Sequence, residues 1–185
     1  IFETFLTSSN IFGLGERAHK FKLNDGIYTI WPNDTSNDLD TENGGHNLYG
    51  TQPFALHRTS SGLFVGLFYN NINAQDFLIN SNNKTVSLEQ RTIGGIVDLF
   101  IFTGKTPEDV IKKYHQIIGY PLLTPIWSLG WQQSKFGIRN DTYLRTIVDR
   151  YEENKIPFDV LWADIDYMED YRDFTVSKGR YNNLP

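Results

Sequence analysis

A change of hydrophobic period at Thr106 is the feature that most constrains what this chain of 185 residues can fold into. Up to about residue 104, short apolar or alternating runs are separated by clusters of Gly, Asn and Ser, as in a sheet protein with many turns. The six runs are 27–31, 54–57, 63–69, 75–79, 85–89 and 96–102. Strands at this spacing predict a sandwich or a barrel.

Beyond Thr106 the pattern becomes one of alternating helices and strands. Thr106 as cap, Pro107 in the first helical position and Gly119 past the end predict a helix over 107–118 that closes the β region. A proline-punctuated connector then leads to three further predicted elements: a strand over 126–131, an amphipathic helix over about 141–154 and a buried parallel strand over 158–165. We therefore divide the chain into domains 1–120 and 121–185.

Strand, helix and strand in this order form a βαβ unit, whose crossover is right-handed. If the unit opens a (β/α)₈ barrel, ligand-binding groups belong at the carboxyl ends of its strands. Residues 132–136 and 164–166 fall at these places.

Composition excludes several classes of function. The formal net charge is -5, and no run of Lys and Arg is longer than a pair, so a nucleic-acid partner is not expected. The apolar runs are shorter than the ~20 residues of a membrane span. The chain has no cysteine, and its four histidines (His19, His46, His57 and His115) lack the spacing of metal ligands. We predict neither metal nor cofactor.

The start at Ile1 and the unclosed segment 181–185 indicate truncation at both ends. Sequons at Asn33, Asn83 and Asn140 favour a secretory, lysosomal or extracellular location without fixing the compartment. The stretch from Asn33 to Asn47, rich in Asn, Asp and Gly, is predicted to be a long loop, and loops of this length are often functional or disordered.

Two carboxylates mark the end of the last predicted strand. If that strand extends far enough, Asp164 and Asp166 share a face, and an unpaired buried carboxylate is costly in a pure packing role. The alternative is a strand-ending turn in which Asp166 caps a loop or pairs with Arg172.

Two further residues have a structural and a functional interpretation. Phe136 is either the aromatic wall of a sugar site or a core residue between strand and helix. Asp34, from its local pattern alone, is a turn aspartate. The segment Gly13-Leu-Gly-Glu16 lacks the third glycine of a dinucleotide-binding loop.

In order and spacing, these motifs resemble the α-glucosidases of glycoside hydrolase family 31 across nearly the whole chain. The motifs are Phe12-Gly-Leu-Gly-Glu16, Trp31-Pro-Asn-Asp34, Asn47-Leu-Tyr-Gly-Thr-Gln-Pro-Phe54, Gly94-Gly-Ile-Val-Asp98, Gly119-Tyr-Pro121, Pro125-Ile-Trp-Ser-Leu-Gly130, Phe158-Asp-Val-Leu-Trp-Ala-Asp-Ile-Asp-Tyr-Met168 and Arg172-Asp-Phe-Thr175. The Asn-Leu-Tyr-Gly and Gly-Tyr-Pro forms look more like the maltase and acid α-glucosidase branch than the glucosidase II branch.

The resemblance implies a galactose-mutarotase-like β-sandwich followed by the start of a (β/α)₈ TIM barrel. It implies a retaining exo-α-glucosidase acting on α-glucosides or maltooligosaccharides. In this resemblance Asp34 contacts sugar hydroxyls, Asp164 binds the non-reducing glucose and Ile165 lines the same subsite. Phe136 stands where relatives have Trp or Tyr, and Asp166 supports the site without touching sugar.

The catalytic nucleophile and general acid of the family come from later barrel strands, and the nucleophile motif, Trp-x-Asp-x-Asn-Glu-like, does not occur in this sequence. No catalytic residue is therefore assigned within the chain. The alternatives are a non-catalytic carbohydrate-binding relative, a glucosidase II-like or α-xylosidase-like member, and an unrelated sandwich used in protein–protein interaction.

Overall fold

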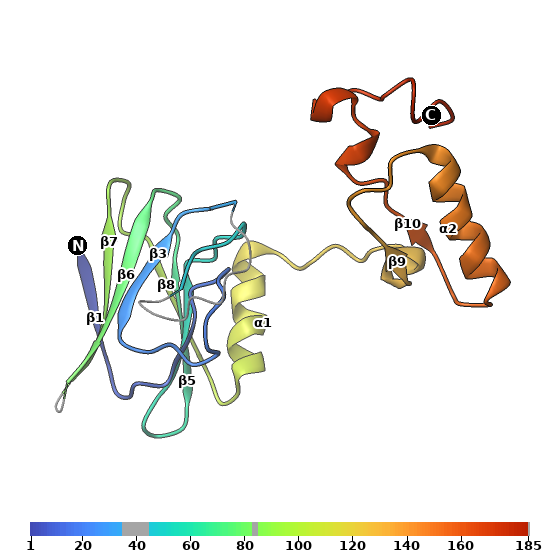
Figure 1. The fold of residues 1–185 in the computed structure, drawn as a ribbon. Coiled ribbons are helices and arrows are strands. Elements are labelled where there is room, and N and C mark those ends of the chain that lie inside the picture. Colours follow the sequence, from blue (N-terminus) through green and yellow to red (C-terminus); the bar gives the residue numbers. More distant parts are fainter. Residues whose placement is uncertain (35–44, 83–84, 185) are drawn as a thin grey trace. The chain divides into compact units, whose positions relative to one another are not determined.

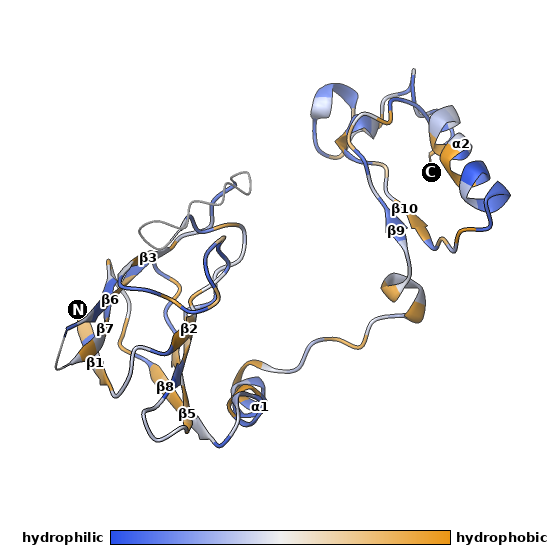
Figure 2. Cartoon of the chain, turned by 60° about the horizontal axis from the view of Figure 1, so that its bottom comes forward, coloured by the Kyte–Doolittle hydropathy of each residue, from blue (hydrophilic) through white to orange (hydrophobic). Residues whose placement is uncertain are grey.

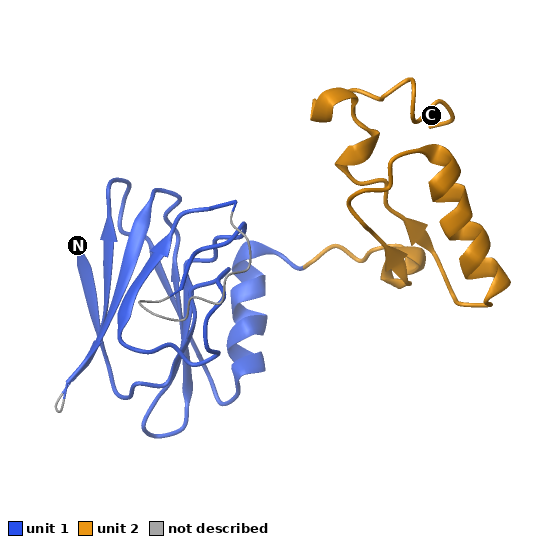
Figure 3. Ribbon diagram, in the orientation of Figure 1, with its two compact units in different colours: residues 1–120 blue, residues 121–185 orange. Residues whose placement is uncertain are grey.

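The computed structural model describes residues 1–34, 45–82 and 85–184 (Figure 1). The chain forms two compact units, Ile1–Tyr120 and Pro121–Pro185 (Figure 3), which we call unit 1 and unit 2 and describe separately. In the described part of the chain, no helix combines the length and apolar character needed to cross a membrane.

Unit 1 contains two antiparallel four-stranded sheets. The first sheet has the order β1-β7-β6-β3, and the second has the order β2-β4-β5-β8. The bounds are Phe2–Leu6 for β1, Ile11–Gly13 for β2, Gly26–Ile30 for β3, Phe54–Arg58 for β4, Phe64–Tyr69 for β5, Gln75–Ser81 for β6, Val86–Thr92 for β7 and Leu99–Gly104 for β8. Both sheets contribute to one buried cluster, in which Tyr28 and Phe77 meet Ile11 and Leu67. Unit 1 is therefore a sandwich and not a barrel.

A second apolar cluster lies where helix α1 (Pro107–Ile118) packs on the second sheet. Strands β5 and β8 and one side of α1 are apolar in Figure 2. A side chain at Gly66 would bring its Cβ within 2.5 Å of Val110, so helix and sheet approach closely there. Thr106 and Asp109 form a reciprocal capping box, which confirms the predicted start of this helix.

Unit 2 is built around one βαβ arrangement. Strand β9 (Gln132–Gln133) pairs in parallel with β10 (Val160–Leu161), and helix α2 (Asp141–Glu153) connects them. Three 3₁₀ helices complete the unit: η2 (Ile126–Leu129), η3 (Ile165–Tyr167) and η4 (Glu169–Tyr171). A small core joins Ile138, Leu144 and Tyr181. The predicted helix and the predicted parallel pairing are confirmed.

Two predictions for unit 2 are wrong in detail. The segment 126–131, predicted as a strand, forms η2, because both the amide and the hydroxyl of Ser128 donate to the carbonyl of Pro125 (3.1 and 2.7 Å). The predicted buried strand over 158–165 is shorter and more exposed: only Val160 and Leu161 are in the ladder, and Trp162 is 54% exposed.

Candidate functional site

The turn that follows β10 presents a carboxylate with an oxygen available for hydrogen bonds. Asp164 caps η3: its Oδ1 accepts a hydrogen bond from the amide of Ile165 at 2.7 Å. Its Oδ2 accepts no hydrogen bond from the described residues, and the side chain is only half-buried. Asp164 can therefore accept hydrogen bonds from a ligand at the carboxyl end of the strand, where α/β barrels bind theirs.

Asp166 does not share a strand face with Asp164, because the chain leaves the strand after Leu161. The Asp166 side chain is only 3% exposed, and its Oδ2 accepts a hydrogen bond from the amide of Gly137 at 2.7 Å. The alternative pairing with Arg172 is also wrong, since Arg172 pairs with Asp170 at 2.7 Å. Asp166 instead joins the turn after β10 to the loop after β9.

That bond brings together the two segments that carry Phe136, Asp164 and Ile165. Phe136 immediately precedes Gly137, and the residue is 59% exposed, so it is not part of the core of unit 2. Its described aromatic neighbour is Tyr171, with ring centroids 6.4 Å apart. Ile165 is 45% exposed. The two loops thus present an aromatic ring, an aliphatic side chain and a carboxylate to solvent.

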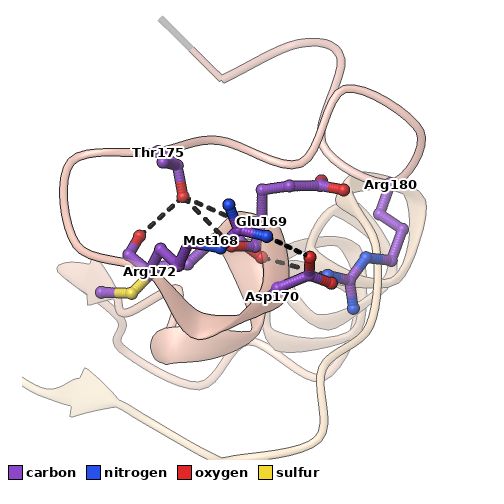
Figure 4. A network of polar contacts seen from close by, with 6 residues as sticks. All are labelled: Met168, Glu169, Asp170, Arg172, Thr175 and Arg180. Carbon is purple, nitrogen blue, oxygen red and sulfur yellow. Dashed lines mark hydrogen bonds and ion pairs between the residues drawn. The ribbon is translucent and has the colours of Figure 1, made fainter.

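A polar network holds the segment that carries Tyr171 (Figure 4). Thr175 donates to the carbonyl of Arg172 at 2.6 Å and accepts from the amide of Glu169 at 2.9 Å. Arg180 donates to the carbonyl of Met168 at 3.0 Å. Sequence reasoning assigned no role to Thr175 or Arg180. The position of Thr175 in the Arg172-Asp-Phe-Thr175 motif was the available signal.

Tyr181, in the core of unit 2, has a shifted pKa. Burial raises the pKa of Tyr181, and the negative charge of Asp166 adds to this effect. The Tyr181 hydroxyl donates to the carbonyl of Ile138. The loop after β9 is thus held to the core by Ile138 and to the turn after β10 by Gly137.

Asp34 belongs to unit 1, and its site is described within that unit alone. The Asp34 side chain is exposed, and its Oδ1 accepts a hydrogen bond from the hydroxyl of Tyr49 at 2.5 Å. This bond raises the pKa of Tyr49. Sequence reasoning missed this partner because fifteen positions separate the two residues.

Other sequence predictions concern loops and glycan sites. Residues 35–44, most of the predicted loop from Asn33 to Asn47, and the sequon residue Asn83 lie outside the described residues. Asn140 caps α2 by accepting from the amide of Tyr143 at 2.8 Å. Within 1–34, 45–82 and 85–184, no group of three or more His, Cys, Asp or Glu side chains is placed to hold a metal ion.

Two family models match the chain, one for each unit. The glycosyl hydrolase 31 N-terminal galactose mutarotase-like domain matches residues 3–77, and the glycosyl hydrolases family 31 TIM-barrel domain matches residues 121–185. The glucosidase II alpha subunit, solved with DNJ bound, superposes with a TM-score of 0.86 at 24% identity, covering 96% of this chain and 21% of that chain. At this identity the superposition shows a shared fold.

Curated relatives extend the similarity along nearly the whole chain. Intestinal sucrase-isomaltase of Oryctolagus cuniculus is 39% identical over 183 residues, which are 98% of this chain and 10% of that protein. Lysosomal alpha-glucosidase of Mus musculus is 34% identical over 184 residues, which are 98% of this chain and 18% of that protein. The chain thus spans less than a fifth of the length of either relative. With a β-sandwich and a barrel-type βαβ unit each matched by its own family model, in the order in which they occur, the chain belongs to glycoside hydrolase family 31.

Proposed function

We propose that this chain is part of a retaining exo-α-glucosidase that releases terminal glucose from α-linked oligosaccharides such as maltooligosaccharides. The observation that carries the proposal is the similarity, over 98% of the chain, to proteins named sucrase-isomaltase and lysosomal alpha-glucosidase. Both names fit the maltase and acid α-glucosidase branch. Family membership argues against an unrelated interaction sandwich.

In this proposal Asp164 recognises the terminal glucose by accepting hydrogen bonds from its hydroxyl groups. Hydrogen bonds to a charged acceptor contribute about 1.5 to 3 kcal/mol each. A site built around such bonds strongly penalises sugars that lack the hydroxyl, because its own polar group is left unpaired. The available Oδ2 of Asp164 supports this role.

Phe136 and Ile165 supply the apolar part of the same subsite. An exposed aromatic ring stacks on the apolar face of a sugar ring. Phe136 has neither an indole NH nor a phenol hydroxyl, so it contributes stacking alone. Asp34 is proposed as a further ligand of sugar hydroxyls, with its carboxylate oriented by Tyr49.

The bond-breaking groups are assigned to residues outside this sequence. Retaining hydrolysis needs a nucleophile and a general acid about 5 to 5.5 Å apart. The family's nucleophile motif does not occur among these 185 residues. The chain therefore supplies recognition, and the rest of the enzyme supplies the reaction.

The test is the substitution Asp164→Asn in the active enzyme that carries this chain. It retains the side-chain shape but removes the charge. Loss of two charge-assisted bonds lowers kcat/KM by about two to four powers of ten. A deoxyglucoside that lacks the contacted hydroxyl should be a much poorer substrate than the parent glucoside for the wild type, and only slightly poorer for Asp164→Asn.

Asp159→Asn is the matched control, because Asp159 also lies beside β10 and also accepts one backbone hydrogen bond, from Trp131 at 3.1 Å. This control should change kcat/KM by less than about twofold. Two results would contradict the assignment of Asp164. One is that the losses in kcat/KM caused by the mutation and by removal of the hydroxyl are additive. The other is an Asp164→Asn enzyme with a lowered melting temperature but normal turnover. Glucose binding without turnover by the wild type would favour the non-catalytic relative, and a preference for xylosides would favour the α-xylosidase-like member.

A further inference from the structure

Unit 1 contains a buried amide at the base of the segment that carries Asp34. The side chain of Asn47 is only 6% exposed, and its two polar atoms contact three separate stretches of backbone. Its Oδ1 accepts from the amide of Trp31 at 2.8 Å. Its Nδ2 lies 3.1, 3.0 and 2.9 Å from the carbonyl oxygens of Glu16, Leu48 and Gly50.

Backbone hydrogen bonds at the same place make a closed junction, which we call the neck (residues 14–17, 31–34 and 45–50). The amide of Asn33 donates to Leu48 (2.9 Å), the amide of Leu48 donates to Glu16 (2.8 Å), and the amide of Glu16 donates to Gly50 (2.8 Å). Arg17 adds hydrogen bonds to the carbonyls of Gly45 (3.1 Å) and Thr29 (2.6 Å). The side chain of Asn47 contacts all three stretches of the neck.

The position of Asp34 depends on this junction at two points. The amide of Asn33, the residue before Asp34, donates a hydrogen bond to the carbonyl of Leu48. The carboxylate of Asp34 accepts a hydrogen bond from the hydroxyl of Tyr49. Both partners directly follow Asn47 in the chain. A displacement of residues 47–50 would therefore move the backbone before Asp34 and the hydroxyl that orients its carboxylate.

The chemistry of the neck requires an amide at position 47. An Asp there would have the same shape but would set a negative charge against three carbonyl oxygens. An apolar side chain would leave the amide of Trp31 without an acceptor and would remove one of the two hydrogen bonds that each of these carbonyls accepts, and unsatisfied buried polar groups are costly. Asn provides an acceptor and donors in one rigid group.

We propose that Asn47 is a positioning residue for Asp34, acting through the neck. The proposal rests on the proposed function in one respect, namely that Asp34 contacts substrate. It adds that a residue without access to the sugar controls recognition of the substrate. A purely structural Asn47 would affect folding but would not couple to Asp34.

The test is a double-mutant cycle in kcat/KM per folded enzyme, using Asn47→Ala, Asp34→Ala and the double variant. Asn47→Ala alone should lower kcat/KM about tenfold, the effect of roughly one lost hydrogen bond. In the Asp34→Ala background the same change should cost less than about twofold. If Asn47→Ala fails to fold, Asn47→Ser takes its place in the cycle, because the serine hydroxyl retains one hydrogen-bond donor. Asn47→Ser should lower kcat/KM less than Asn47→Ala, and this loss should likewise shrink in the Asp34→Ala background.

Asn71→Ala is the matched control. Asn71 is 9% exposed, lies in the same unit, and donates to the carbonyl of Gly94 at 2.9 Å rather than to a carbonyl of the neck. It should lower the melting temperature without coupling to Asp34.

The outcomes separate the two proposals. If Asp34→Ala alone leaves kcat/KM unchanged, the role of Asp34 as a sugar ligand is wrong, and the role of Asn47 is wrong with it. If Asp34→Ala lowers kcat/KM but Asn47→Ala has no effect, or the same effect in both backgrounds, only the positioning role is overturned. Coupling shown equally by Asn71→Ala would also overturn it.

Discussion

At the scale of single residues, two carboxylates two positions apart have opposite surroundings. Asp166 is buried and accepts the amide of Gly137, whereas Asp164 is half-buried with one oxygen available. An aspartate can therefore hold a loop in place at position 166, while at position 164 the same type of side chain is available to a ligand. The difference arises because η3 turns the chain between the two residues.

His57 gives unit 1 a pH-dependent stability. Burial lowers the pKa of His57 below its ordinary value of 6.5. The unfolded chain therefore binds more protons than the folded chain at acidic pH. The stabilising contribution is fully present above about pH 6.5 and is lost as pH falls through the lowered pKa of the folded state.

The measurement is the free energy of unfolding of the chain between pH 7.5 and pH 5, the range about histidine's ordinary pKa of about 6.5. The His57→Gln variant, which cannot gain this proton, should show a smaller decline at the acidic end than the wild type. Equal declines for both proteins would contradict the role of His57.

The sequence singles out candidate site residues, but it does not reveal the residues that hold them in place. Asp164 and Phe136 stand out because they lie at the carboxyl ends of predicted strands and belong to recognisable motifs. Tyr49, Asn47 and the bond from Gly137 to Asp166 do not, because each depends on hydrogen bonds between segments that meet only in the folded chain.

At the scale of elements, the strands predicted in unit 1 lie close to observed strands, whereas the two strands predicted in unit 2 do not: 126–131 contains η2, and only Val160–Leu161 of 158–165 is in a ladder. Strand β8 begins at Leu99 rather than at residue 96, because Asn71 holds the carbonyls of Gly94 and Ile96 in a loop. Strands β1 and β2 were not predicted. Strand β2 has only three residues, and its place is set by pairing with β4, which no local pattern reveals.

The connection between the loops after β9 and β10 depends on Asp166. Asp166→Ala removes the acceptor of the Gly137 amide and should lower the free energy of unfolding by about 1 to 3 kcal/mol. Asp166→Asn retains a carbonyl acceptor and should lose less. The measurement is denaturant unfolding of the chain, followed by the fluorescence of the tryptophans in unit 2.

Asp170→Asn serves as the control, because Asp170 is exposed and pairs with Arg172 at the surface. Exposed ion pairs contribute about 0 to 1 kcal/mol. A loss as large for Asp170→Asn as for Asp166→Ala would contradict the proposed connection.

At the scale of the whole molecule, the proposed function assigns recognition of the sugar to this chain and the bond-breaking groups to other residues of the enzyme. We expect the purified chain of 185 residues to show no turnover of a chromogenic α-glucoside, because the nucleophile motif is absent from it. Turnover is measured against a mock purification from the same host. Activity that rises in proportion to the added chain, and is absent from the mock sample, would contradict the assignment of the catalytic pair to other residues.

The pairing of β1 with β7 has a consequence for synthesis on the ribosome. Phe2 lies opposite Gln90, so β1 has no partner strand in its sheet until most of unit 1 has been translated. Contacts between residues so distant in sequence also slow folding. During that interval the unpaired backbone of β1 can associate with other nascent chains. A chaperone that binds extended segments would compete with this association.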